Sequence, residues 1–421
     1  ALLEKTIENG ASEEEMFSTF VGLDEDDILD AINNTAEVAE KCNASIKIGH
    51  YLPEYYAIPE GETPRSLLVK EVLKGARRTG FIKNKQYMQD VQNEIDVIDE
   101  CGYSGYFLIV QNYVTSARAN GNIVGDGRGS ACGCKVSYLL DISRVEPMQY
   151  NLLFERFLAR GREPDIDVDF SDQDSVFVDL QQKYGEENVA RIIAFGTLAP
   201  KAVCRRVMSA FEHETSEINK INKLIPDLCS SMKVAYETSP ELLQYRKKYQ
   251  KEFHIIERLE GIVSHESQHA GGVIVYPNLS SMLPIKTRAE DRNKRIIAFD
   301  KYMLEAIGHI KFDVLGLETL PIIKRTLEFI KDSKGVDVDL YKIDLNDKNV
   351  YKMLCSGDVS GVFQLNNQAQ KTTEQKPTCF EDLIAINAMI RPKQNWALQW
   401  QHCIETTLIY GNSLQLHGCV V

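Results

Sequence analysis

The stretch Asp165-Ile166-Asp167-Val168-Asp169-Phe170 alternates acidic and apolar residues without a break. Such alternation is typical of a half-buried β-strand, in which Asp165, Asp167 and Asp169 share one face and the apolar residues share the other. Three carboxylates on one face repel each other, and aspartate is a poor strand former. A multivalent cation between the acids would resolve this repulsion, and oxygen ligands of this kind suit Mg²⁺. The simpler alternative is a solvated polar face on an edge strand.

A second stretch, Lys311-Phe312-Asp313-Val314-Leu315-Gly316, also predicts an acid-bearing strand. A buried aspartate is costly unless it is paired or bound to a metal. Asp313 would complete the carboxylate cluster if this strand lies beside the first one. The alternative is an ion pair between Asp313 and Lys311.

A glycine-rich loop precedes the first acidic strand. The sequence Gly125-Asp126-Gly127-Arg128-Gly129-Ser130 lets the backbone approach a ligand closely. Successive N–H groups in such a loop bind anions, and Arg128 and Ser130 add donors for a phosphate. Together, such a loop and a carboxylate pair are the minimal set for metal-dependent nucleotidyl transfer. The alternative is an ordinary turn before a helix near residues 135–140.

Arg156 lies within the apolar run Leu152-Leu153-Phe154-Glu155-Arg156-Phe157-Leu158. A buried arginine usually has a partner, so this side chain either pairs with an acid such as Glu155 or reaches toward a ligand.

Most of the remaining chain has helical periodicity. Helices are predicted to open at residues 13–17 and to cover residues 27–42, 66–80, 87–101, 106–117 and much of 197–262. Proline and glycine between residues 52 and 61 mark a boundary. In the first helix of the last region, Lys201, Arg205 and Arg206 fall on roughly one side. They either contact a nucleic-acid backbone or form a solvated helix face.

The segment His265-Glu266-Ser267-Gln268-His269 matches the HExxH pattern of zinc peptidases. That pattern requires a helix, because two histidines one turn apart share the metal. Here Ala270-Gly271-Gly272 follows at once, and residues 273–277 predict a strand. A zinc peptidase is therefore a distant alternative, and the roles of His265 and His269 stay open.

Charge and composition narrow the class of protein. The net charge is −13, and residues 1–65 alone hold fifteen acidic and four basic residues. The acidity is therefore concentrated in one segment and does not exclude a nucleic-acid groove elsewhere. No apolar run has the length of a membrane span, and the first residues resemble no secretory signal. Ten scattered cysteines favour a reducing, cytoplasmic location.

Eight motifs occur in a fixed order: GRGSACG, LLFERFL, PDIDVDF, KYG, FGTLAPKAVCR, HAGGVIV, KFDVLGLETL and GVFQL. Together they resemble the C-family replicative DNA polymerases of bacteria, the polymerase III alpha chains of the shorter, DnaE-like type. The resemblance extends from about residue 1 to Pro392.

The resemblance implies an α+β fold, with a palm of the polymerase-β-like nucleotidyltransferase type and an inserted helical thumb. The implied domains are the tail of a PHP domain (1–60), the palm (61–196 and 266–320), the thumb (197–265) and the start of helical fingers (321–392). Residues 393–421 resemble nothing in the family and read as an aberrant tail.

The resemblance also implies a function, namely template-directed DNA synthesis in chromosomal replication. The implied reaction adds dNMP from a dNTP to a primer 3′-OH, without a 3′-5′ exonuclease. Two Mg²⁺ ions would be held by Asp165, Asp167 and Asp313, with Asp169 outside the catalytic set. Phosphate contacts would come from Arg128, Gly129, Ser130, Arg156 and Lys311, and duplex contacts from Lys201, Arg205 and Arg206.

The implied partners are primer–template DNA, dNTP, the sliding clamp and other replicase subunits, with no membrane. A second hypothesis is an inactive fragment of such a polymerase, which only binds DNA or nucleotide weakly.

Overall fold

The structure is a computed structural model that describes residues 22, 24–43, 48–53, 58–227, 229–288, 291–365 and 376–389. The chain divides into two units, residues 1–48 and residues 49–421. In the first unit, helix α3 (Glu25–Lys41) confirms the helix predicted over residues 27–42. Its N-cap Asp24 accepts the Asp26 N–H at 2.9 Å, and acids fill its first turn. The helix predicted from residue 13 lies outside the described residues.

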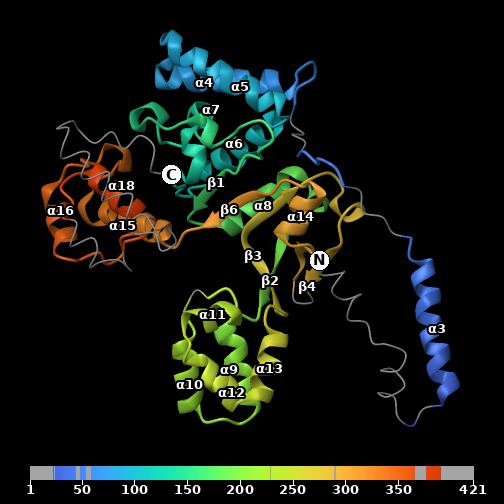
Figure 1. Cartoon of the computed structure of the whole chain (residues 1–421). Coiled ribbons are helices and arrows are strands. Elements are labelled where there is room, and N and C mark those ends of the chain that lie inside the picture. The colour runs from blue at the N-terminus through green and yellow to red at the C-terminus, as the bar shows by residue number, and fades with distance from the viewer. Residues whose placement is uncertain are drawn as a thin grey trace. The chain divides into compact units, whose positions relative to one another are not determined.

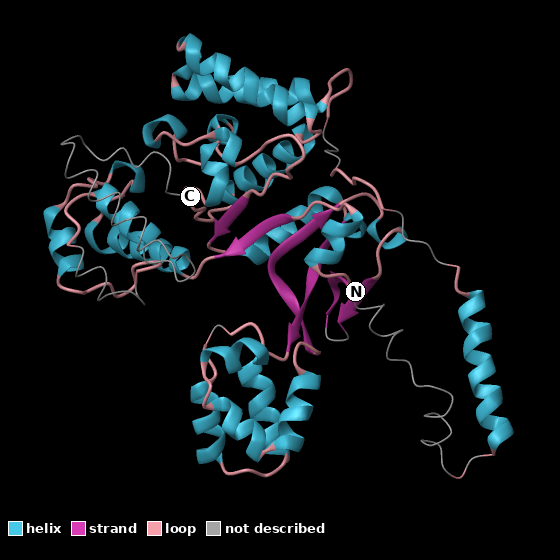
Figure 2. Ribbon diagram, viewed as in Figure 1, coloured by secondary structure: helices cyan, strands magenta, loops and turns pink. Residues whose placement is uncertain are grey.

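The second unit is organised around one mixed sheet of six strands, which Figure 2 shows in magenta. The strand order is β1-β6-β3-β2-β5-β4. The strands are β1 (Asp167–Phe170), β2 (Val189–Thr197), β3 (Val263–Val275), β4 (Ile285–Arg288), β5 (Asp291–Ile297) and β6 (Phe312–Gly316). Strands β1 and β6 run parallel, whereas β3 lies antiparallel to both β6 and β2. The two stretches predicted as acid-bearing strands are therefore neighbours.

Helices make up most of the rest of this unit (Figure 1). Before the sheet lie α4 (Pro64–Thr79), α5 (Lys85–Glu100), α6 (Ser104–Ala119) and α7 (Lys135–Leu139). Helix α8 (Gln173–Tyr184) follows β1, and α14 (Lys301–Ile307) precedes β6. After the sheet come α15 (Thr319–Lys334), α16 (Lys348–Cys355) and α18 (Phe380–Met389). The helices predicted over residues 66–80, 87–101 and 106–117 are confirmed as α4, α5 and α6. The mixture of sheet and helices confirms the α+β class.

Two apolar layers enclose the sheet. Ile166, Val168 and Phe170 alternate with the acids, as predicted, and belong to a core cluster with residues of α4 to α8. A second cluster joins Ile192 of β2 and Leu304 of α14. The strand face that carries the acids is therefore fixed by burial of the opposite face.

Strands β2 and β3 carry a helical insertion that has its own core. It consists of α9 (Pro200–Ala210), α10 (Thr215–Leu224), α11 (Met232–Thr238), α12 (Leu242–Lys248) and α13 (Gln250–Leu259), and it confirms the helical region predicted within 197–262. Its buried residues, among them Met208 and Phe253, form a cluster of their own. The Leu198 N–H donates to the Ile262 carbonyl at 3.0 Å, and the Gly261 N–H donates to the Leu198 carbonyl at 3.0 Å. The two ends of the insertion are therefore hydrogen-bonded to each other.

The HExxH segment is part of strand β3 and not of a helix. Along a strand, His265 and His269 are four residues of about 3.3 Å apart, too far for one zinc ion. The zinc-peptidase alternative is therefore wrong on geometry.

No helix among the described residues is both long enough and apolar enough to cross a membrane. The predicted tail at 393–421 lies outside the described residues.

Candidate functional site

Three carboxylates converge where β1 meets β6. Asp167 and Asp313 are paired positions of these parallel strands, and Asp165 lies two residues before β1. One oxygen from each carboxylate lies within 4.8 Å of the other two, and among the described residues this is the one group of acids, histidines or cysteines so placed. Asp165 is exposed, Asp167 half-buried and Asp313 buried. The structure thus brings together the three acids that the sequence analysis selected.

Lys311 neutralises part of this negative charge. Its Nζ lies 3.5 Å from Asp165 Oδ1 and donates a short hydrogen bond to Asp313 Oδ2. Burial disfavours the charged form, but the hydrogen bond to Asp313 and the nearby acids hold the pKa of Lys311 above its ordinary value. The predicted alternative of a simple Asp313–Lys311 pair is therefore present together with the cluster.

The cluster suits a hard cation. Burial, with the charges of Asp165 and Asp313, raises the pKa of Asp167 to about 6. Asp313 Oδ1 is buried without a hydrogen-bond partner, although its other oxygen binds Lys311. A buried carboxylate oxygen without a donor is costly, and a divalent ion would satisfy it. The donor set, all carboxylate oxygens, is the type that Mg²⁺ prefers.

Tyr106 of α6 contacts both acid-bearing segments. Its ring stacks on Phe312, the residue before Asp313, with centroids 4.8 Å apart and an interplanar angle of 17°. Its hydroxyl accepts the N–H of Ile166, the residue before Asp167, at 3.3 Å. One buried side chain therefore positions the backbone of both aspartates.

The glycine-rich loop 125–130 lies beside the carboxylates. A Cβ added to Gly129 would lie 3.4 Å from Asp167 Oδ2, and the φ of Gly129 is +62°, a conformation that favours glycine. Arg128 forms an ion pair with Asp169 at 2.9 Å. This pair explains why Asp169, although it shares β1 with Asp167, stands outside the metal-ligand group.

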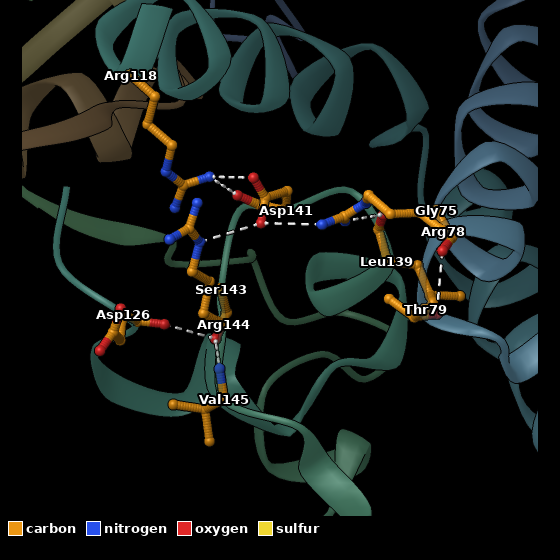
Figure 3. Close-up of polar contacts among 10 residues, drawn as sticks. All are labelled: Gly75, Arg78, Thr79, Arg118, Asp126, Leu139, Asp141, Ser143, Arg144 and Val145. Atoms are coloured by element: carbon orange, nitrogen blue, oxygen red, sulfur yellow. Dashed lines mark hydrogen bonds and ion pairs between the residues drawn. The ribbon is translucent and has the colours of Figure 1, made fainter. Parts of the chain in front are cut away.

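Asp141, which the sequence analysis missed, is the centre of an arginine cluster that Figure 3 shows. Arg118 donates to Asp141 Oδ2 at 2.7 Å, whereas Arg144 and Arg78 approach Asp141 Oδ1 at 3.3 and 3.5 Å. Asp141 follows α7 with a φ of +59°. Left-handed residues often end a helix, and Asp tolerates this conformation better than most residues do. That position after a helix is the only local signal for it.

This cluster holds the glycine-rich loop. The Arg144 N–H donates to the Asp126 carbonyl at 2.6 Å, and the Ser143 hydroxyl donates to the same oxygen at 3.1 Å (Figure 3). The Arg144 guanidinium also lies 4.3 Å from the ring centroid of Tyr341, in the short helix η7 (Leu340–Lys342). Loop 125–130 is therefore fixed by a network that extends into the segment after β6.

Two further residues of the predicted phosphate site lie in short 3₁₀ helices. Ser130 is half-buried in η2 (Gly129–Gly133), next to the loop glycines. Arg156 is exposed in η4 (Phe154–Arg156), not buried as its apolar surroundings suggested, and its carbonyl accepts a hydrogen bond from Arg162 at 2.8 Å.

The basic residues of the insertion lie on α9 and have local partners. Lys201 forms an ion pair with Asp227, and Arg205 donates to Asn219 at 3.2 Å. Arg205 and Arg206 are exposed.

Comparison with known proteins shows which protein family this sequence matches. Residues 66–316 match the family described as "Bacterial DNA polymerase III alpha NTPase domain", and residues 319–407 match "Bacterial DNA polymerase III alpha subunit finger domain". The chain belongs to the bacterial DNA polymerase III alpha family. The NTPase-domain match contains every residue of the carboxylate cluster and of loop 125–130. The finger-domain match extends to residue 407, so the likeness to this family continues beyond Pro392, where the sequence analysis ended it.

Individual relatives of this polymerase family agree. The DNA polymerase III subunit alpha of Escherichia coli K12 is 36% identical over 408 residues, which cover 90% of this chain and 34% of that protein. The corresponding subunits of Bacillus subtilis 168 and Pseudomonas fluorescens are 35% and 37% identical, over 86% and 90% of this chain and 33% and 34% of theirs. The chain spans about a third of the length of the curated relatives it matches.

Proposed function

We propose that this chain carries the catalytic centre of a DNA-directed DNA polymerase, which adds dNMP from a dNTP to a primer 3′-OH in bacterial chromosomal replication. The observation that carries this proposal is the register of β1 and β6, which pairs Asp167 with Asp313 and brings Asp165 within the same 4.8 Å group. Family membership and the adjacent glycine-rich loop support it.

In this proposal Asp165, Asp167 and Asp313 hold two Mg²⁺ ions. When bound, such ions activate the attacking hydroxyl and neutralise charge on the phosphates. The chain's own residues position the triphosphate: the N–H groups of loop 125–130 and the Ser130 hydroxyl donate to phosphate oxygens, and Arg128 adds charge. Lys311, already at the carboxylates, contributes a positive charge where negative charge develops.

The proposed domains follow the same assignment. The sheet with its flanking helices would be a palm of the polymerase-β-like type (61–196 and 266–320), the insertion a thumb (197–265) and residues 321–392 the start of the fingers. Residues 1–60 would be the tail of a PHP domain. Primer–template DNA would contact Lys201, Arg205 and Arg206, and Arg156 would contribute near the nucleotide. The sliding clamp and other replicase subunits are the proposed partners in the cytoplasm.

The test is primer extension by the purified chain with Mg²⁺ and all four dNTPs, beside an Asp165→Asn protein. We expect extension by the parent and none by the variant, because the variant lacks one of the three proposed metal ligands. Asp165 is exposed, so its substitution should leave the core intact. Asp174→Asn is the matched control, since Asp174 is exposed on α8 and pairs with Arg191 instead of the cluster. Equal extension by the parent and the Asp165 variant would refute the proposed site.

A chain that binds nucleotide without extending a primer is the second candidate. It predicts no extension by either protein, together with Mg²⁺-dependent dNTP binding that Asp165→Asn abolishes. Calorimetry with dNTP distinguishes this result from a wrong assignment of the carboxylates, for which neither protein would bind.

A further inference from the structure

Strand β3 contains a wide bulge beside the carboxylate site. In the β2–β3 ladder, Val273 faces Arg191 and Gln268 faces Ile193. The four residues 269–272 therefore stand opposite a single residue of β2. At the end of this bulge β3 pairs with β6, because Gly272 and Val273 are the partners of Asp313 and Phe312. Bulges are frequent next to active sites, where they redirect a strand or a side chain.

The imidazole of His269 closes this bulge. Its Nδ1 accepts the N–H of Gly272 at 2.8 Å and the N–H of Gly271 at 3.3 Å. A nitrogen that accepts two N–H groups carries no proton, so the neutral ring has its proton on Nε2. Burial lowers the pKa of His269 and thereby favours this neutral form.

Glycine at position 271 permits close packing on β6, and glycine at position 272 leaves room for the His269 ring. A Cβ on Gly271 would lie 2.6 Å from the Val314 carbonyl oxygen, and a Cβ on Gly272 would lie 2.8 Å from His269 Nδ1. Asp313 is therefore held between two strand neighbours, Asp167 on one side and Gly272 on the other. The position of the bulge limits where β6, and with it the Asp313 carboxylate, can lie.

We propose that His269 is a positioning residue of the carboxylate site, which acts through its Nδ1 on the backbone of Gly272 and so fixes Asp313 for metal binding. This role deepens the proposed function and rests on it. It assigns a structural role to the segment His269-Ala270-Gly271-Gly272, which replaces the zinc-peptidase hypothesis. The competing role is a direct one, in which the Nε2–H of the same ring donates to the substrate.

The two roles depend on different ring nitrogens, so two substitutions separate them. Asparagine places its side-chain oxygen, an acceptor, where Nδ1 lies, whereas the longer glutamine places its amide NH₂, a donor, near Nε2. The measurements are Mn²⁺ affinity by calorimetry and amide hydrogen exchange of Gly271 and Gly272, in the whole chain with His269→Asn or His269→Gln. The exposed His265 on the same strand supplies the matched control His265→Gln.

We expect His269→Asn to retain the parent Mn²⁺ affinity and the protection of both amides. His269→Gln should bind Mn²⁺ about tenfold more weakly, as is usual when a group that orients a ligand is lost, and its two amides should exchange faster. His265→Gln should match the parent. Parent-like Mn²⁺ affinity and amide protection in the Gln protein would overturn the proposal and leave the direct role, because a donor to the substrate affects neither measurement.

Two further results keep the outcome decisive. ¹⁵N NMR of the parent reports the tautomer, and a proton on Nδ1 would refute the proposal even if the Gln protein failed to fold. A parent chain that binds no Mn²⁺ would refute the proposed metal site. In that case the exchange of Gly271 and Gly272 would still show whether Nδ1 closes the bulge, although the role toward the metal would fall with the site.

Discussion

Asp167 and Asp313 are paired positions on parallel strands, so their side chains leave the sheet on the same face. The sequence separates them by almost 150 residues, and the sheet places them beside each other. Burial, and after it repulsion by the charges of Asp165 and Asp313, raises the pKa of Asp167. The arrangement is electrostatically unfavourable for an empty site and favourable for one that binds a cation.

Removal of either paired carboxylate should weaken metal binding. We expect Asp167→Asn and Asp313→Asn to lower Mn²⁺ affinity by about tenfold or more, because each removes one charged oxygen ligand. Isothermal titration calorimetry measures this change. Asp169→Asn is the matched control, since its carboxylate lies on the same strand but pairs with Arg128. Equal loss in the control would show that general charge on β1, and not the cluster, determines binding.

Loss of Lys311 should have the opposite effect on the metal. Its ammonium group contacts one oxygen of Asp165 and one oxygen of Asp313, so its positive charge repels a cation at the same carboxylates. Lys311→Met should therefore raise Mn²⁺ affinity, by about threefold, while it lowers the unfolding temperature of the metal-free chain because the acids lose their counter-charge. Thermal scans with and without Mn²⁺ test both parts. Weaker Mn²⁺ binding in this variant would contradict the prediction.

The arginine cluster should depend on the charge of Asp141 and not on its backbone conformation. Glycine adopts the φ of +59° without strain, whereas asparagine keeps the side-chain shape. We expect Asp141→Gly and Asp141→Asn each to lower the free energy of unfolding by about 1–3 kcal/mol, because Arg118 loses its carboxylate partner. Urea denaturation measures the loss. An unchanged free energy of unfolding in the Asp141→Gly protein would show that the ion pairs of Asp141 with the three arginines contribute little to stability.

His309 should make stability depend on pH. It is 1% exposed, neither ring nitrogen has a hydrogen-bond partner, and burial lowers its pKa to about 4. The unfolded chain binds this proton near pH 6.5, so acidification favours unfolding between pH 6.5 and 4 and costs about 3 kcal/mol over that range. His309→Phe retains an aromatic ring beside Tyr51, whose ring stacks on His309 at 4.5 Å.

The measurement for His309 is the free energy of unfolding at pH 7 and at pH 4.5. The parent should lose more of it than His309→Phe, because other titrating groups affect both proteins alike. Equal losses would mean that the buried imidazole is protonated as readily as in the unfolded chain.

Sequence reasoning predicted those parts of the fold and the site that depend on local pattern. The alternation at 165–170 determines which side chains face the core, and the glycines at 125–129 predict a loop with close backbone approach. Both are confirmed. The pairing of Asp313 with this strand was predicted only as a condition, since no local signal fixes which strands are neighbours. The register of β1 and β6 meets that condition.

Other features could not be predicted because they depend on contacts between distant residues. Arg78 is 63 residues from Asp141 in the chain, and Arg118 is 23 residues away, so no periodicity connects them. The partner of Arg128, 41 residues away, is another such case. The bulge at 269–272 was missed because the segment that leads into it matches a peptidase motif. Only the pairing of β3 with β2 shows that four residues of β3 stand opposite one residue of β2.

The hydrogen bonds between Leu198 and the segment 261–262 have a consequence for how this molecule can change. The paired strands β2 and β3 hold the two ends of the insertion together. The sixty or so residues between these ends therefore need no further contact to bring them together. Helices could be lengthened, shortened or exchanged there without moving the strands that bear Asp167 and Asp313. The helical insertion and the strands that bear the carboxylates can therefore diversify at different rates, joined by a stem of two strands.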